Sequence, residues 1–213
     1  ERAQELIYTI GSLMRKKRIP EMPVFLDSPM AGKVTNVFRK YRNLFDGEAW
    51  KLIDAGESPL RFPQLRVVES PEESRGINSL KESCVIMSTS GMCTAGRIKH
   101  HLIHNLGRRE SLILFVGYQA AGTLGRLILS GKKLVRILGR EWYVKAQVGQ
   151  VSGFSGHADR TAMIKWLDNF SKAPERVFLT HGEEESALAF AETIRHRYGW
   201  DVHVPEYKET VNL

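Results

Sequence analysis

Short apolar runs alternate with amphipathic stretches along most of the chain, and this alternation limits the fold more than any other feature of the sequence. Between the runs, apolar side chains recur every three or four residues, which is the period of a helix with one buried face. Strands that alternate with helices favour a mainly parallel sheet covered by helices. The sequence therefore predicts an α/β fold. Its strands are expected at residues 23–27, 65–68, 83–88, 111–116 and 133–137.

Local signals between these strands indicate where helices begin. Ser70 precedes Pro71 and stands three residues before Glu73. This arrangement is typical of a capping box with proline at the first helical position, so a helix is expected to begin there. Further helices are expected at residues 2–17, 35–45, 47–53, 96–106 and 121–129.

The alternation changes near residues 139–146, where we place a boundary. Residues 141–151 form one long extended run whose apolar side chains alternate from Trp142 to Val148, as on a half-buried strand. A helix, a short strand at residues 176–179 and a last helix follow. The end of the chain is therefore expected to be organised differently from the region before it.

Composition limits the class of protein. The chain has 213 residues, of which 42% are hydrophobic and 26% charged, the balance of a folded globular protein. No apolar run approaches the roughly 20 residues that span a bilayer, and the first residues lack the apolar core of a signal peptide. Cys84 and Cys93 are too few for a disulfide framework, which favours reduced thiols and the cytoplasm. A net charge of +7 suits binding to polyanions such as nucleic acids, although charge alone is a weak signal.

Two histidines, His157 and His181, occupy similar positions along the chain. Each follows a predicted strand and lies in a glycine-containing turn before a predicted helix. Loops that leave the carboxyl ends of parallel strands are where active sites gather, and an imidazole there can bind a metal or transfer a proton. Alternatively, each histidine caps its helix or bonds a backbone group. The residues alone leave these interpretations open.

A loop of small and hydroxyl residues between a predicted strand and a predicted helix is a third candidate. Its backbone N–H groups could cradle a phosphate near the start of the helix, and two nearby basic side chains would add positive charge. The alternative is an ordinary capped turn. The residues concerned are Ser88, Thr89, Ser90, Gly91, Arg97 and Lys99.

Other polar residues are weaker candidates. Asp27 ends a predicted strand and could be catalytic by position, but a helix-capping or turn carboxylate is the preferred interpretation. His100 and His104 share a helix face, yet His101 stands where a zinc protease has glutamate. We therefore expect these three histidines to face solvent or a partner.

Five stretches, in order along the chain, resemble recurrent motifs of the β-CASP family of metallo-β-lactamase-fold RNA nucleases. The stretch Gly-Phe-Ser-Gly-His-Ala-Asp at residues 153–159 resembles motif B, and Leu-Thr-His-Gly-Glu at residues 179–183 resembles motif C. Residues 28–31 and 90–92 match two other recurrent stretches, and residues 2–5 resemble the helix start that follows the family's first metal-binding half. The matches cover essentially all of the chain.

This resemblance implies a division of the chain. Residues 21–140 would be the β-CASP domain, an α/β fold with a mainly parallel sheet flanked by helices. Residues 1–20 would be a helix leading out of a metallo-β-lactamase domain. Residues 141–213 would be the C-terminal strand-helix segment of that domain's αββα fold. The stretch at residues 96–101 looks more like bacterial members than eukaryotic cleavage-factor subunits.

The resemblance also implies a phosphodiesterase with two zinc ions that cleaves RNA. On this basis His181 is a ligand of one zinc, and His157 faces the scissile phosphate as general acid or leaving-group stabiliser. Ser155 joins the residues expected to contact RNA. The family also suggests a homodimer, while nothing suggests a membrane.

The metal-binding motifs of the family's N-terminal half are missing, including its later His and Asp ligands and the acidic motif A. No His-x-His-x-Asp-His spacing occurs among the seven histidines. We therefore expect the N-terminal half of the same protein to be absent from this sequence and to be a partner of this chain. The chain alone is expected not to hold its zinc pair and to be inactive.

Two other functions remain open. The first is a non-catalytic RNA-binding or scaffold relative in an RNA-processing complex, against which the presence of His157 and His181 argues. The second is a metallo-hydrolase of a different ester, which the motifs and the +7 charge disfavour.

Overall fold

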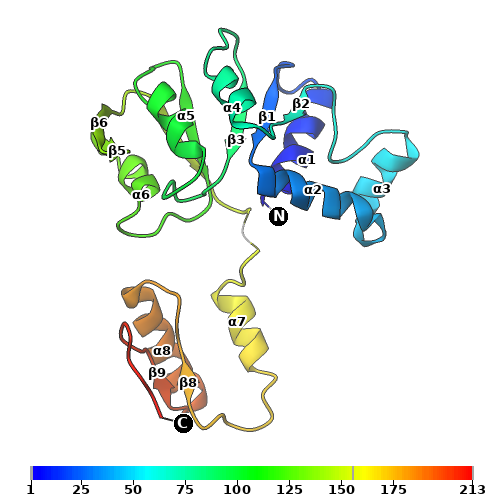
Figure 1. Cartoon of the computed structure of the whole chain (residues 1–213). Coiled ribbons are helices and arrows are strands. Elements are labelled where there is room, and N and C mark those ends of the chain that lie inside the picture. Colours follow the sequence, from blue (N-terminus) through cyan, green and yellow to red (C-terminus); the bar gives the residue numbers. More distant parts are fainter. Residues whose placement is uncertain (1, 155, 213) are drawn as a thin grey trace. The chain divides into compact units, whose positions relative to one another are not determined.

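The structure is a computed structural model that describes residues 2–154 and 156–212. The chain forms two compact units, Glu1–Ser155 (unit 1) and Gly156–Leu213 (unit 2). Helices flank mainly parallel strand pairs, which confirms the predicted α/β class (Figure 1). Among the described residues, no helix combines the length and the apolar character needed to cross a membrane.

The first part of unit 1 is a three-stranded parallel sheet in the order β2-β1-β3. Helix α1 covers it through Ile7 and Met14, which are buried with Val24 and Leu26 of β1. The elements are α1 (Arg2–Arg15), β1 (Val24–Asp27), α2 (Pro29–Lys40), a 3-10 helix (Arg42–Leu44), α3 (Gly47–Asp54), β2 (Leu65–Val67), α4 (Pro71–Ile77) and β3 (Val85–Ser88).

Helix α2 begins at Pro29 rather than at residue 35 as predicted. The Ser28 hydroxyl accepts a hydrogen bond from the Ala31 amide at 3.2 Å, and proline takes the first helical position. These two residues therefore start the helix earlier than the apolar pattern indicates. The capping box at Ser70 is confirmed, because its hydroxyl and the Glu73 carboxylate each accept a hydrogen bond from the other residue's amide.

The second part of unit 1 contains a parallel pair, β4-β7, and an antiparallel pair, β5-β6. Leu102 of α5 and Leu106, the C-cap residue of that helix, are buried with Phe115 of β4 and Ile128 of α6. The elements are α5 (Ile98–Asn105), β4 (Leu112–Val116), α6 (Leu124–Leu129), β5 (Leu134–Ile137), β6 (Arg140–Tyr143) and β7 (Gln147–Val151).

The prediction of one extended strand over residues 141–151 is wrong. The run is divided between β6, which pairs with β5, and β7, which pairs with β4. At the break, the amides of Lys145 and Ala146 both donate to the Leu106 carbonyl oxygen, at 2.7 and 3.0 Å. The chain bends there because its two halves hydrogen-bond to different strands.

Unit 2 is built from two helices and a short parallel strand pair. Leu167 of α7, Ala191 and Ile194 of α8 and Val202 of β9 form its buried core. Gly199, with φ of 69°, ends the last helix in the left-handed conformation. The elements are α7 (Arg160–Leu167), β8 (Val177–Phe178), α8 (Glu184–Tyr198) and β9 (Val202–His203), of which β9 was not predicted.

The domain limits at residues 20/21 and 140/141 stay predictions. The boundary between the two compact units falls between residues 155 and 156. Residues 147–151 belong to unit 1 because β7 pairs with β4.

Candidate functional site

The carboxyl ends of β1 and β3 bring Ser28 and Thr89 together. The parallel register pairs Asp27 with Ser88, the last residues of the two strands. One residue further on, the hydroxyl oxygens of Ser28 and Thr89 are hydrogen-bonded at 3.0 Å. The Ser88 hydroxyl donates to the Asp27 carbonyl oxygen at 3.1 Å. Two of the predicted phosphate-binding residues, Ser88 and Thr89, therefore lie half-buried where these strands end.

The loop that follows β3 folds back on itself. The Cys93 amide donates to the Ser90 carbonyl oxygen at 3.0 Å. Gly96 has φ of +78°, and a Cβ atom there would lie 2.5 Å from the Thr89 carbonyl oxygen. Glycine is therefore needed at this position for the loop to close. Gly91 is exposed, whereas Ser90 is half-buried.

A second loop, which follows β4, supports the first. The buried Gln119 side chain donates from Nε2 to the Gly91 carbonyl oxygen at 3.1 Å. The Gly125 amide donates to the Met92 carbonyl oxygen at 3.1 Å. No local pattern indicates this contact of Gln119, because its partner lies 28 residues away along the chain. The loop with the predicted phosphate-binding residues is thus held by one side-chain and one backbone hydrogen bond from another part of unit 1.

A buried ionic cluster lies at the same edge of the sheet. The Asp27 carboxylate is fully buried and accepts hydrogen bonds from Arg97 at Oδ1 and from the Ser74 hydroxyl at Oδ2, both at 2.6 Å. Its Oδ2 also lies 2.5 Å from His101 Nε2. Burial raises the pKa of the Asp27 carboxyl, but hydrogen bonds from these three partners bring that pKa below its ordinary value. The interpretation of Asp27 as a capping or turn carboxylate is wrong, since it is the centre of an ion-pair cluster.

The predicted solvent-facing position of His101 is also wrong. Only 4% of this residue is exposed, and its Nδ1 lies 3.1 Å from Asn78 Oδ1. The contact to Asp27 spans 74 residues of sequence, so no local pattern indicates it. His100 and His104 on the same helix are exposed, as expected.

Arg97 joins this cluster with both ends of its guanidinium. Besides the ion pair to Asp27, it donates to the Val68 carbonyl oxygen at 3.3 Å and to the Glu69 carbonyl oxygen at 2.9 Å. A phosphate would have to compete with these bonds. Binding of RNA by Arg97 and by the half-buried Lys99 stays a prediction.

The start of the motif B segment is fixed to unit 1. The Phe154 carbonyl oxygen accepts a hydrogen bond from Arg2 Nε at 2.9 Å. The Gln150 side chain of β7 donates to the Gly117 carbonyl oxygen at 3.0 Å. Ser155, which was predicted to contact RNA, lies outside the described residues.

The two candidate histidines lie in unit 2, in the turns that precede its helices. His157 and His181 are exposed, and each stands three residues before a helix, α7 and α8 respectively. The N-cap residues are Asp159, which accepts a hydrogen bond from the Ala162 amide at 2.7 Å, and Glu183. Neither histidine is therefore the N-cap of its helix, and the alternative that each bonds a backbone group stays a prediction. His181 also has φ of +68°, a conformation that non-glycine residues adopt mainly in tight turns.

These histidines do not form a metal site by themselves. Within residues 2–154 and 156–212, no three His, Cys, Asp or Glu side chains come together as metal ligands. Zinc usually takes four ligands in a structural site and three protein ligands in a catalytic one. The described residues therefore do not fit a complete zinc centre.

Family models match two segments of the chain. Residues 3–128 match the Beta-Casp domain, and residues 143–205 match the Zn-dependent metallo-hydrolase RNA specificity domain. The first segment holds the loop after β3 and the Asp27 cluster, and the second holds both histidine turns.

Curated relatives match the whole chain. Ribonuclease TTHA0252 of Thermus thermophilus is 38% identical over 99% of this chain and 47% of its own length. Transcription termination factor FttA is 36% identical in Methanocaldococcus jannaschii and 31% identical in Methanosarcina mazei, over 100% of this chain and 34% of each factor. The chain thus spans between a third and a half of the length of these relatives. Together, the two domain matches and these relatives show that the chain belongs to the β-CASP family of RNA-processing nucleases.

Proposed function

We propose that this chain supplies the RNA-contacting β-CASP region and two histidines of a zinc-dependent ribonuclease. The observation that carries the proposal is the matched, exposed placement of His157 and His181 before the two helices of unit 2. Both lie in the segment that matches an RNA specificity domain. RNA would be the substrate, and its phosphodiester bonds would be hydrolysed.

His157 would act as the general acid. An imidazole is suited to donate a proton near neutral pH to the oxygen that leaves the scissile phosphate. Its exposed position leaves room for a substrate to approach. His181 would be a single zinc ligand, with the other ligands supplied by protein outside these 213 residues. No step through zinc is assigned to this chain, because its described residues do not assemble a zinc centre.

The loop at the ends of β1 and β3 would contact the RNA backbone. Ser88, Thr89, Ser90 and Gly91 offer hydroxyl and backbone groups at the edge of a parallel sheet, where ligands of α/β folds commonly bind. Contacts of this kind give affinity without reading sequence. The free cysteines, Cys84 and Cys93, agree with a reducing compartment, and we propose the cytoplasm. A homodimer stays a prediction.

The test is cleavage of a labelled RNA by the longer protein that we assign to this chain. His157→Ala should lower kcat by more than about 100-fold and leave RNA affinity within about twofold, because it removes proton transfer rather than binding. His196→Ala is the matched control, since this exposed histidine lies in the last turn of α8 and belongs to neither candidate turn. Full activity of His157→Ala would contradict the assignment. The 213-residue chain alone should bind RNA and release no product at any zinc concentration.

A non-catalytic function is the second candidate, because several relatives are named as transcription termination factors rather than nucleases. The same experiment separates the two. If the longer protein binds RNA but forms no product with zinc present, the binding function replaces the nuclease function.

A further inference from the structure

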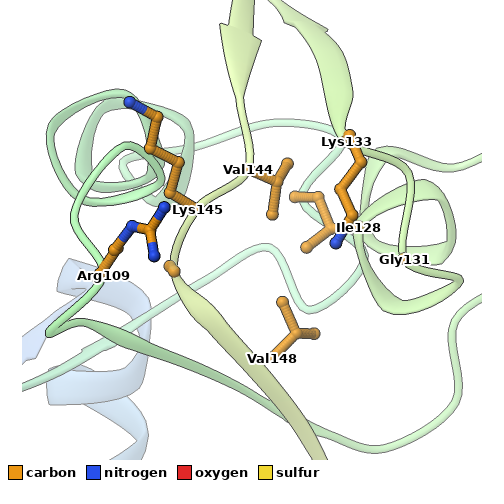
Figure 2. Close-up of a pocket in the computed structure, with 8 residues that line it drawn as sticks. Arg109, Ile128, Gly131, Lys133, Val144, Lys145 and Val148 are labelled. Atoms are coloured by element: carbon orange, nitrogen blue, oxygen red, sulfur yellow. The ribbon is translucent and has the colours of Figure 1, made fainter.

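A basic hollow lies at the amino ends of β4 and β7, away from the loops described above. Its volume is about 460 Å³, within the roughly 300–1,000 Å³ typical of small-molecule sites. It is lined by Arg109, Ile128, Gly131, Lys133, Val144, Lys145, Ala146 and Val148. Figure 2 shows Arg109 and Lys145 on one side and Lys133 with Ile128 on the other, with Val144 and Val148 between them.

The hollow is separated from the candidate site by the length of the strands. Arg109 precedes β4, and Lys145 and Ala146 precede β7, whereas the glycine-containing loops follow the other ends of both strands. The two strands run parallel over five residues, about 17 Å at 3.3 Å per residue. A ligand in the hollow would therefore not occupy the loops of unit 1 that follow the carboxyl ends of these strands.

All charged side chains that line the hollow are positive. Three of its side chains are cationic and none is acidic. The nearest carboxylate in sequence, Glu110, is already paired with Arg108 at 3.0 Å. No ion pair within residues 2–154 and 156–212 engages Arg109, Lys133 or Lys145. These three positive charges would stabilise a bound anion, because no carboxylate of the described residues neutralises them.

Apolar side chains form the rest of the lining. The half-buried Val144 and Val148 offer an apolar surface above the buried Ile128, and inorganic phosphate has no apolar group to contact it. The walls are held by backbone bonds: the Val144 amide donates to the Lys133 carbonyl oxygen at 2.9 Å, and the Lys145 amide to the Leu106 carbonyl oxygen at 2.7 Å. The hollow is thus formed before a ligand arrives.

We propose that this hollow binds a nucleoside phosphate, with the base on the apolar lining and the phosphate between Arg109 and Lys133. The Arg109 fork suits two phosphate oxygens, and Lys133 adds a point charge from the opposite side (Figure 2). Lys145 strengthens the field at the rim. A free nucleotide and one nucleotide of an RNA strand present the same chemistry.

The test is a titration of the full 213-residue chain followed by methyl NMR. The probes are AMP, a 5′-phosphorylated RNA trinucleotide, adenosine and inorganic phosphate. AMP or the trinucleotide should shift the methyl signals of Val144 and Val148, which line the hollow and are half-buried. Tighter binding of AMP would identify a free nucleotide as the ligand, and tighter binding of the trinucleotide would identify an RNA strand. Binding of inorganic phosphate as tight as that of AMP, or shifts confined to the Met92 methyl group, would overturn the proposal.

Two double variants separate a site from a general charge effect. Arg109→Ala with Lys133→Ala should weaken AMP or trinucleotide binding by about tenfold or more, because both phosphate contacts are lost. Lys132→Ala with Arg140→Ala removes the same charge from exposed positions that do not line the hollow, and should change affinity by less than about twofold. Equal weakening by the two pairs would refute the site. His157→Ala should leave this binding unchanged, so failure of the nuclease proposal can be recognised separately.

Discussion

The buried histidine of unit 1 and the two candidate histidines of unit 2 are placed in opposite ways. His101 is buried and lies within hydrogen-bond distance of Asp27 and Asn78 through its two ring nitrogens. His157 and His181 are exposed in turns before helices whose N-caps are other residues. A histidine held on both sides by protein groups stabilises the fold, whereas one in an exposed turn can meet a metal or a substrate. Burial and hydrogen-bond partners, rather than residue type, therefore separate the two roles.

The largest effect should come from removing the centre of the buried cluster. Asp27→Ala should lower the free energy of unfolding of unit 1 by about 3–5 kcal/mol, because Arg97 loses its ion-pair partner and His101 its carboxylate. Urea unfolding followed by the fluorescence of Trp142 would measure this. Asp54→Ala, at an exposed position, is the control and should cost less than about 0.5 kcal/mol. A loss for Asp27→Ala no larger than for this control would show that the cluster contributes nothing.

The histidines themselves provide the second test. His101→Ala should cost about 2–3 kcal/mol of unfolding free energy, because it leaves the buried Asp27 oxygen short of a partner. His157→Ala and His181→Ala should each change the free energy of unfolding of unit 2 by less than about 0.5 kcal/mol. Thermal unfolding of the three variants gives the comparison. A similar cost at all three positions would remove the distinction between structural and functional histidines.

The loop after β3 can be tested with two glycines of equal φ. Gly56 and Gly96 both have φ of +78°, but only at Gly96 would a Cβ meet the Thr89 carbonyl oxygen. Gly56→Ala should cost about 1 kcal/mol from backbone conformation alone, and Gly96→Ala about 1–2 kcal/mol more. Chemical denaturation of the two variants measures the difference. Equal costs would mean that the loop shifts to accommodate the methyl group.

The smallest effect concerns pH. Hydrogen bonds lower the pKa of folded Asp27, so its carboxylate adds stability above the unfolded pKa of about 3.9, and that stability is lost as pH falls through the folded pKa. Unit 1 should therefore lose stability below about pH 4 more steeply in the natural chain than in Asp27→Asn. Urea unfolding between about pH 3 and 7 would measure both. Parallel curves would show that Asp27 titrates alike in the folded and unfolded states.

The sequence alone predicts features that depend on neighbouring residues. The capping box at Ser70 is confirmed because all of its hydrogen bonds lie within four residues. The placement of both candidate histidines before helices is confirmed for the same reason. Features that depend on distant partners are not predicted: the contact of Asp27 with His101, and the division of residues 141–151 between two sheets. Neither leaves a local periodic signal.

The parallel pairing of β4 with β7 has a consequence for the order in which the chain can fold. Leu112 of β4 pairs with Gln147 of β7, so the first pair is complete only after 35 further residues have been made. A parallel partner at this distance carries a loop-closure cost that a hairpin avoids. During synthesis, the edge of β4 that pairs with β7 therefore stays unpaired until β7 has emerged from the ribosome. A chain ended at residue 128, where the Beta-Casp match stops, would leave that edge unpaired.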